Sequence, residues 1–191
     1  MVNGVLGQTH QVTTLLCAEI AALGVTQIAV PHFTPLTAGL TLSGLYGAWW
    51  GSLLPDIDEP KSLINQTLGP VGRVISHWLS HRGITHTLLA WLTVTVLPCW
   101  CLRSWITGNW WQQCGMAILL GLSFGYFCHL LEDSWSVAGV HWLYPLTPAK
   151  EKQHRKQRWH YHTGGQTERL WHVMAVIGVI VTGILLGGRW L

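Results

Sequence analysis

Histidine and aspartate residues occur in three short motifs whose spacing suits a metal site. Asp56 and Asp58 stand two residues apart between prolines, and His81 and His86 come directly before about 16 apolar residues. The third motif is a His-x-x-x-Asp pair, His129 and Asp133. Imidazole nitrogens and carboxylate oxygens are common ligands of divalent metals. Because a hydrophobic segment does not need histidines to begin, we interpret these residues as metal ligands gathered at a membrane surface.

Each motif also has a simpler interpretation. The aspartate pair could be a solvated acidic loop, although Pro55 and Pro60 favour a fixed, non-helical turn. Residues i and i+4 share one face of a helix. His129 and Asp133 can therefore hold one cation together, or Asp133 can orient His129, or the two can form a structural hydrogen bond. These alternatives remain open from the residues alone.

The composition indicates a membrane protein of one domain. Of the 191 residues, charged residues make up 10% and hydrophobic residues 49%. The charged share is about half of what is usual in soluble domains. A soluble domain could not cover its surface with so few charges, whereas lipid can contact the apolar faces of a multi-span membrane protein. The five cysteines have no CxxC spacing, and we expect them to be free thiols.

Five apolar segments approach the roughly 20 residues that a helix needs to cross a bilayer. We therefore predict an all-α polytopic bundle with about five transmembrane helices, in a single integral membrane domain that covers residues 1–191. The predicted spans are 12–30, 36–54, 84–102, 113–131 and 170–188. The loops 55–83 and 132–169 then lie on the same side of the membrane as the N-terminus.

The distribution of lysine and arginine orients the predicted bundle. Nine of these residues fall on the side of the N-terminus, and two fall on the other side. The positive-inside rule makes the N-terminal side cytoplasmic. This orientation places all the candidate ligands at the cytoplasmic end of the bundle. Neither the spans nor the orientation were chosen from these residues, so their common position supports a shared site. They are His10, Asp56, Asp58, His81, His86, His129 and Asp133.

Small residues recur every four positions in the second and fourth predicted spans. The second has Gly39, Ser43, Gly47 and Gly51, and the fourth has Ala117, Gly121 and Gly125. Residues four apart share a helix face, and small residues there allow helix backbones to approach closely. The stripe of the fourth span continues into His129 and Asp133, so this pair is predicted to face the bundle. The alternative is that glycine is simply common in membrane helices.

Several charged residues stand outside the three motifs. Glu168 opens the last span, where it can interact with the helix dipole or join the site. Glu19 lies about 13 Å deeper than His10 by helical rise, so it is not expected in the same set of ligands. The basic run from Lys150 to Arg158 is expected to attract anionic lipid headgroups, which makes membrane lipids expected partners. No motif indicates nucleic-acid binding.

Three segments in order resemble the YdjM-like family of bacterial inner-membrane proteins. They are LPDIDEPKS at 54–62, HRGITHTLL at 81–89 and GYFCHLLED at 125–133, followed by AGV at 138–140 and LYP at 143–145. The resemblance extends from about His10 to Glu168. The family is described as metal-dependent hydrolases, with a LexA-linked name in some members. The resemblance implies that the seven candidate ligands, including His10, form a polar core.

The expected function is hydrolysis by a metal site at the cytoplasmic membrane face. Four histidines and three aspartates exceed the three or four protein ligands of one catalytic zinc, so one or two divalent ions are expected, with zinc first and manganese or magnesium as alternatives. Such a site activates water, and Asp56 or Asp58, if not a ligand, could act as general base. Arg82, with Lys61, would stabilise an anionic transition state. These charges fit a phosphoester substrate or a lipid.

Two other classes of protein remain as alternatives. A metal transporter or permease should carry polar residues deep within its spans, where Glu19 is the one carboxylate. A non-catalytic membrane protein could use the same residues to bind a structural metal and dock a cytosolic partner. A structural site should be closed, without an open coordination position.

Overall fold

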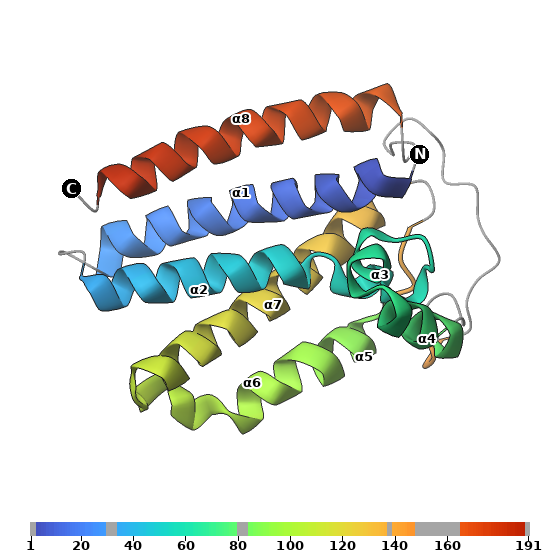
Figure 1. Cartoon of the computed structure of the whole chain (residues 1–191), viewed down its shortest axis with the longest axis horizontal. Helices are drawn as coiled ribbons and strands as arrows, with labels where there is room; N and C mark the ends of the chain where they lie inside the picture. The colour runs from blue at the N-terminus through green and yellow to red at the C-terminus, as the bar shows by residue number, and fades with distance from the viewer. Residues whose placement is uncertain (1–2, 30–33, 80–83, 137–138, 148–164, 190–191) are drawn as a thin grey trace.

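The computed structural model describes residues 3–29, 34–79, 84–136, 139–147 and 165–189. Within these ranges the chain forms helices and turns (Figure 1). The long helices are α1 (Asn3–Ala29), α2 (Pro35–Gly51), α7 (Trp110–Ser134) and α8 (Gln166–Gly188). The shorter elements are η1 (Leu54–Asp58), α3 (Leu63–Leu68), α4 (Pro70–Trp78), α5 (Leu88–Trp91), η2 (Leu92–Val96), α6 (Leu97–Cys101) and η3 (Arg103–Thr107).

Five segments of the bundle alternate in direction along the chain: α1, α2, the continuous α5–η2–α6, α7 and α8 (Figure 1). As a result α1 and α8 run in the same direction, with their first turns at one end of the bundle, and the two helices pack against each other. The last turns of α2 and α7 reach that same end. We call it the site end, because it carries the residues predicted as ligands.

The prediction of an all-α membrane bundle is confirmed, but five crossings are not. Three helices are long and apolar enough to span a bilayer: Gly7–Ile28 within α1, all of α7 and all of α8. The second predicted span is a helix of 17 residues, and the apolar helix of the third covers only Leu88–Cys101. The latter contains a π-helical turn, η2, in its middle.

Local capping explains where the helices depart from the predicted spans. Thr34 accepts a hydrogen bond from Thr37 N, and Pro35 occupies the first turn of α2. Thr87 caps α5 by accepting from Ala90 N, so this helix starts at Leu88 rather than at 84. Asn109 forms a capping box with Gln112 and starts α7 three residues before the predicted span.

Helices α2 and α7 are in backbone contact along the predicted small-residue stripes. A Cβ atom on Gly47 would lie 2.2 Å from Ile118 O, and one on Gly51 would lie 2.3 Å from Leu122 O. From the other side, a Cβ on Gly125 would lie 2.2 Å from Ala48 O. These distances leave no room for a side chain, so the prediction of close helix approach is confirmed.

Polar side chains connect α1 to α8. Trp171 Nε1 donates to Thr13 Oγ1 at 3.0 Å, and Thr182 Oγ1 donates to Glu19 Oε2 at 2.5 Å. Such interhelical hydrogen bonds stabilise membrane bundles modestly. They explain why α1 continues through the polar residues that weaken its hydropathy pattern. Glu19 is buried in this contact and lies apart from the site end.

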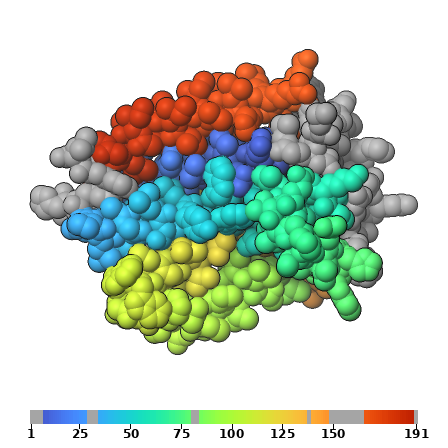
Figure 2. All heavy atoms as spheres, viewed as in Figure 1, coloured from blue at the N-terminus to red at the C-terminus, as the bar shows by residue number. Residues whose placement is uncertain are grey.

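The predicted loop 55–83 contains the short elements η1, α3 and α4. In the space-filling view they cover the site end of the visible face, beside α2 (Figure 2). Ser62 caps α3 by accepting from Asn65 N, and Gly69, with a positive φ of 59°, separates α3 from α4. The basic run at 150–158 lies outside the described residues.

Candidate metal centre

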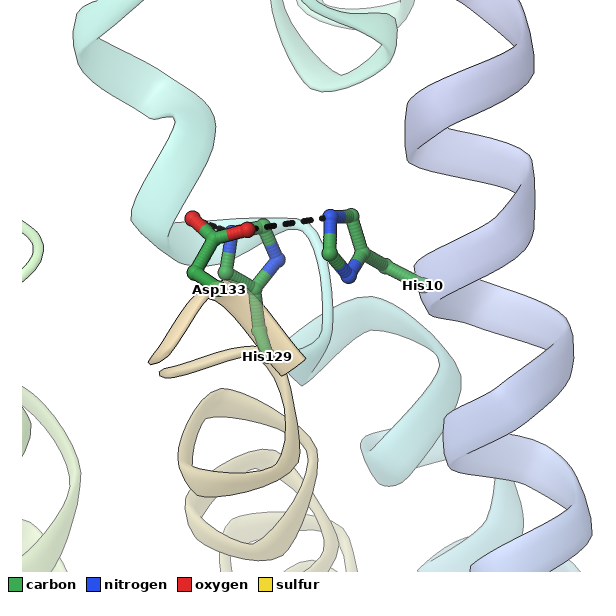
Figure 3. Close-up of side chains that lie close together, drawn as sticks. All are labelled: His10, His129 and Asp133. Carbon is green, nitrogen blue, oxygen red and sulfur yellow. Dashed lines mark ion pairs between the residues drawn. The ribbon is translucent and has the colours of Figure 1, made fainter. Parts of the chain in front are cut away.

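Five polar side chains from four parts of the chain meet at the site end. His10 comes from α1 and Asp56 from η1, and His86 lies in the turn before α5. His129 and Asp133 occupy successive turns of α7, and Figure 3 shows them with His10 pointing toward them. The contact between α2 and α7 brings the η1 turn, which follows α2, next to the end of α7. The stripe prediction that His129 and Asp133 face the bundle is therefore confirmed.

His129 is fully buried and has a defined orientation. Its Nδ1 lies 2.6 Å from the carbonyl oxygen of Ser52, and because a carbonyl only accepts, Nδ1 carries the proton and donates. Its Nε2 points to Asp133 Oδ2 at 3.4 Å and Asp56 Oδ1 at 3.7 Å, but has no hydrogen-bond partner. An imidazole fixed through Nδ1 with its Nε2 left for another group is the usual arrangement of a metal ligand.

His10 repeats this arrangement from the other side of the site. Its Nδ1 donates to Glu132 Oε2 at 2.8 Å, and its Nε2 lies 3.5 Å from Asp133 Oδ1. The His10 ring stacks on that of His129, with ring centroids 4.0 Å apart. A carboxylate that holds the far nitrogen of an imidazole raises the basicity of the near nitrogen. Glu132 thus orients His10 toward the centre.

His86 supplies a third imidazole. Its Nδ1 contacts Thr85 Oγ1 at 3.1 Å, and its Nε2 lies 3.3 Å from Asp133 Oδ2 and 3.7 Å from Asp56 Oδ1. The backbone that carries it is held by the buried hydroxyl of Tyr126, which donates to Thr85 O at 2.5 Å. In all three histidines Nε2 therefore faces the carboxylates, while Nδ1 contacts another group.

The spacing of these atoms fits a divalent ion. Two ligand atoms that each lie about 2.0–2.1 Å from one zinc at a tetrahedral angle are about 3.3–3.4 Å apart. Several of the observed distances between nitrogen and oxygen atoms are close to this value. Two sets have all their ligand atoms within 4.8 Å of one another: His10, His129 and Asp133, and Asp56, His86 and His129.

Asp133 presents its two oxygens to different histidines. Oδ1 faces His10, whereas Oδ2 faces His86 and His129. A carboxylate in this position can bind one ion with either oxygen, or bridge two ions. The two overlapping sets of ligands are compatible with both possibilities.

The charges of the site hold Asp56 and His86 ionised. Burial alone would raise the pKa of Asp56, but the imidazoles of His129, His86 and His10 outweigh it and lower this pKa below its ordinary value. Burial would lower the pKa of His86, but the nearby carboxylates of Asp133 and Asp56, 3.3 and 3.7 Å from its Nε2, raise it to about 10. A cation is thus favoured between these carboxylates, and in the metal-free protein a protonated imidazole fills that role.

A buried asparagine fixes the turn that carries Asp56. Asn65 Nδ2 donates to Ile57 O at 2.9 Å and to Glu59 O at 2.8 Å. Both acceptors belong to the turn, so Asn65 holds η1 and the segment after it in one shape. Asp58 is also buried in this turn, but it belongs to neither set of ligand atoms.

The remaining predicted residues have different positions. Lys61 is exposed and Glu168 is buried in the first turn of α8, and neither belongs to the two ligand sets. His81 and Arg82 lie outside the described residues. Their roles, like that of Asp58, stay predictions.

Three supporting residues were missed by the sequence reasoning. Glu132 precedes Asp133 and could have been noticed as a second carboxylate near His129. Ser52 acts through its backbone carbonyl, which no side-chain motif can reveal. Asn65 lies nine residues after Asp56, and a hydrogen bond to main-chain oxygens leaves no pattern in the sequence.

Comparison with known proteins identifies a family that covers nearly the whole chain. Residues 5–190 match the family described as YdjM inner membrane protein. The chain is similar to the inner membrane proteins YdjM of Escherichia coli and Shigella flexneri, each 36% identical over 107 residues, which is 52% of either chain. It is also similar to the uncharacterized protein YvsG of Bacillus subtilis, 32% identical over 97 residues, 51% of this chain and 54% of the relative. These alignments span about half the length of the curated relatives. No solved structure matches the chain.

Proposed function

The chain belongs to the YdjM inner membrane protein family, and we propose that it is a metal-dependent hydrolase acting at the cytoplasmic face of that membrane. The observation that carries the proposal is the convergence of three imidazole Nε2 atoms on Asp56 and Asp133. The orphaned Nε2 of His129 supports it further, because a buried nitrogen acceptor without a partner is costly. The excess of lysine and arginine on the N-terminal side supports the cytoplasmic orientation.

The residues that would hold the ion are His10, Asp56, His86, His129 and Asp133. Nitrogen and oxygen donors suit zinc first, with manganese or magnesium as alternatives, and five donors leave room for one ion or two. When bound, such an ion lowers the pKa of a water and polarises the oxygen of a phosphoester or ester. His81 and Asp58 are further predicted ligands.

The partial exposure of the site supports catalysis over a closed structural role. The side chains of His86, Asp56 and Asp133 are 21%, 25% and 22% exposed, whereas His129 is fully enclosed. One side of the centre is therefore anchored in the bundle, and the other remains accessible to a substrate and to water. A structural metal site would be closed on all sides.

The chain's own residues supply the rest of the proposed chemistry. Asp56 is held as a carboxylate by its neighbours, so it can accept a proton if it is not a ligand. Arg82 and Lys61 are the cations proposed to hold an anionic substrate, since a guanidinium binds phosphate oxygens in a bidentate manner. We propose a phosphoester, free or part of a lipid, as the substrate class.

The transporter alternative has less support. Glu19, the carboxylate within the first span, is engaged by Thr182 between α1 and α8. The described ligands lie together at one end of the bundle rather than along a path through it. This distribution favours chemistry at the membrane surface.

Hydrolysis assays on metal-loaded protein test the proposal. Purified protein with Zn, Mn or Mg is offered phosphomonoesters, phosphodiesters and lipid phosphates, with Asp56→Asn and Asp58→Asn measured beside it. We expect the wild type to turn over substrate and Asp56→Asn to abolish this turnover. His77 is an exposed histidine on α4, and we expect His77→Gln to leave turnover unchanged. Turnover that survives in a double Asp56→Ala/Asp58→Ala variant would contradict the proposed mechanism.

A further inference from the structure

A cavity of about 420 Å³ lies beside the metal centre, between α1, α7 and α8. These are the three helices that are long and apolar enough to cross a bilayer. Glu132 connects the two features, because it lines the cavity and also accepts the hydrogen bond of His10. A molecule in the cavity would therefore end next to the ligands of the centre.

The wall of the cavity suits an alkyl chain. Leu131, Trp135, Trp171, Cys17 and Cys128 contribute aliphatic, aromatic and sulfur surface. Thr13 also lines the cavity, and its hydroxyl already accepts a hydrogen bond from Trp171 Nε1 at 3.0 Å. Sites for apolar ligands have this character, with few polar groups placed at one end. Here Glu132, Thr167 and Glu168 lie at the end nearest the centre.

The cavity is continuous with surface that lipid must cover. Trp135 is 70% exposed, Trp171 51% and Leu131 42%, and Cys17 is exposed as well. On α8 the exposed apolar surface continues from Trp171 to residues such as Ile177 and Ile180. Tryptophans at the ends of spanning helices are typical of the interface between headgroups and acyl chains. In a bilayer, lipid is therefore the molecule expected at this opening.

The cavity is long enough along α1 for an acyl chain that runs parallel to the membrane normal. It extends from Thr9 to Cys17 along α1, about 12 Å by helical rise, from the level of His10 toward the middle of the span. A lipid in it would have its chain along the membrane normal and its polar linkage at the level of the site.

We propose that this cavity holds one acyl chain of a membrane phospholipid whose phosphoester or ester group reaches the metal centre. The inference rests on the proposed hydrolase function, which it deepens by making the substrate a lipid taken directly from the surrounding leaflet. A water-soluble phosphoester would leave the cavity unused.

Photocrosslinking in vesicles tests the position of the chain without requiring metal or turnover. The protein is reconstituted in phosphatidylethanolamine and phosphatidylglycerol with a trace of phosphatidylglycerol that carries a diazirine in one acyl chain. Labelling of Cys17, Leu131 and Trp171 is compared by peptide mass spectrometry with labelling of Ile177 and Ile180, which report general lipid contact. We expect the cavity residues to be labelled in excess of these references.

Two variants of α1 make the test specific. Cys17→Phe adds an aromatic ring inside the cavity and should lower the excess labelling of Leu131 and Trp171 about tenfold. This is the loss of affinity expected when the ring displaces roughly two methylene groups of the acyl chain from the cavity. Ala21→Phe adds the same ring one turn away, on an exposed position that does not line the cavity, and should change nothing. Retained elution as a single species in detergent confirms that both variants fold.

The outcomes separate this inference from the proposed function. Equal labelling of cavity and reference residues, or an effect of Ala21→Phe as large as that of Cys17→Phe, would overturn the inference even if the protein hydrolyses soluble phosphoesters. Specific labelling in a protein that binds no metal and hydrolyses nothing would overturn the proposed function, and with it the claim that the bound lipid is a substrate.

Discussion

A buried polar atom without a partner costs free energy unless something binds it. The Nε2 of His129 is such an atom, and its neighbours Asp133 and Asp56 approach to 3.4 and 3.7 Å without forming a hydrogen bond. The other nitrogen is fixed by Ser52, so the ring cannot turn away without losing that bond. At the residue scale, the site is therefore arranged for a cation between an imidazole and two carboxylates.

Metal affinity should rise with pH. The pKa of His86 is raised to about 10 in the metal-free protein, so at neutral pH an incoming ion must displace a proton from its Nε2. Asp56, whose pKa is lowered, is already ionised and does not compete. We expect the dissociation constant for zinc to fall by about tenfold per pH unit between pH 6 and 9 for each histidine ligand that must lose a proton. Competition with a chelating dye measures this slope.

Removing His86 should flatten that dependence. His86→Gln is expected to weaken zinc binding and to reduce the slope by about one proton, while the exposed His77→Gln keeps the wild-type slope. A slope that is unchanged in His86→Gln would mean that another group releases the proton.

The candidate site could be predicted only in part from the sequence. His10, Asp56, His86, His129 and Asp133 come together in the structure because their motifs stand at the ends of apolar segments, which the pattern marks clearly. The distinction between Asp56 and Asp58 could not be predicted, because it depends on the path of a five-residue 3₁₀ turn. The orienting groups Ser52 and Asn65 act through main-chain contacts, which spacing does not encode.

At the scale of elements, the contact between α2 and α7 sets the geometry of the site. It places Ser52, at the end of α2, against His129, and it places η1 beside the last turns of α7. Glycines make this contact possible because a Cβ on either helix would collide with the backbone of the other. The small-residue stripes predicted this packing, since a period of four residues marks one helix face.

Gly125→Ala should separate these helices. The added Cβ would lie 2.2 Å from Ala48 O and 2.8 Å from Ser52 N, and backbone atoms cannot move aside cheaply. We expect a loss of about 1–3 kcal/mol in the free energy of unfolding, together with weaker metal binding. Thermal unfolding in detergent measures the first effect. Gly187→Ala is the matched control, because its Cβ meets nothing within 4 Å, and we expect it to be neutral or stabilising.

The turn that carries Asp56 offers a second test at this scale. Asn65→Leu keeps the volume but removes the two hydrogen bonds to Ile57 O and Glu59 O, at a cost of about 1–3 kcal/mol in stability. Because the turn then loosens, zinc affinity should fall about tenfold or more. Gln66→Leu, which removes a single exposed bond to Lys61 O, should leave affinity unchanged. Equal affinity in all three proteins would show that the turn needs no such support.

The extent of the short elements was the least predictable part of the fold. The segment 55–83 was predicted only as a loop, and the helices α3 and α4 form within it because Ser62 caps α3 and Gly69 makes a turn with positive φ. The polar residues of α1 weakened the signal for its first turns, and the partners of those residues lie on α8, more than 150 positions away. Local pattern cannot report such distant partners.

At the scale of the whole molecule, the alternating segments bring every described ligand to one end (Figure 1). Three of the described helices are long and apolar enough to span a membrane. The segments α2 and α5–η2–α6 run beside them but are shorter than these three helices. The alternation of all five segments favours five crossings. The first turns of α2 and α7 would then both lie on the periplasmic side of the membrane.

Cysteine labelling in whole cells tests this topology. The five native cysteines are first removed: Cys17, Cys99, Cys101, Cys114 and Cys128. Single cysteines then replace Leu36, Thr107 or Arg73, which are all exposed. A membrane-impermeant maleimide should label the first two from the periplasm and the third only after lysis. Protection of Leu36→Cys or Thr107→Cys in intact cells would contradict five crossings, and labelling of Arg73→Cys there would reverse the orientation.

The central claim is that the polar residues at the site end bind metal, and metal content measures it most directly. Detergent-purified wild type, His129→Gln and His77→Gln are analysed by mass spectrometry as isolated and after reconstitution with zinc, manganese or magnesium. We predict about one or two equivalents of metal in wild type and His77→Gln, and loss of metal in His129→Gln. Absence of metal from all three proteins, or equal content in all three, would contradict the account and leave the histidines as a structural hydrogen-bond network.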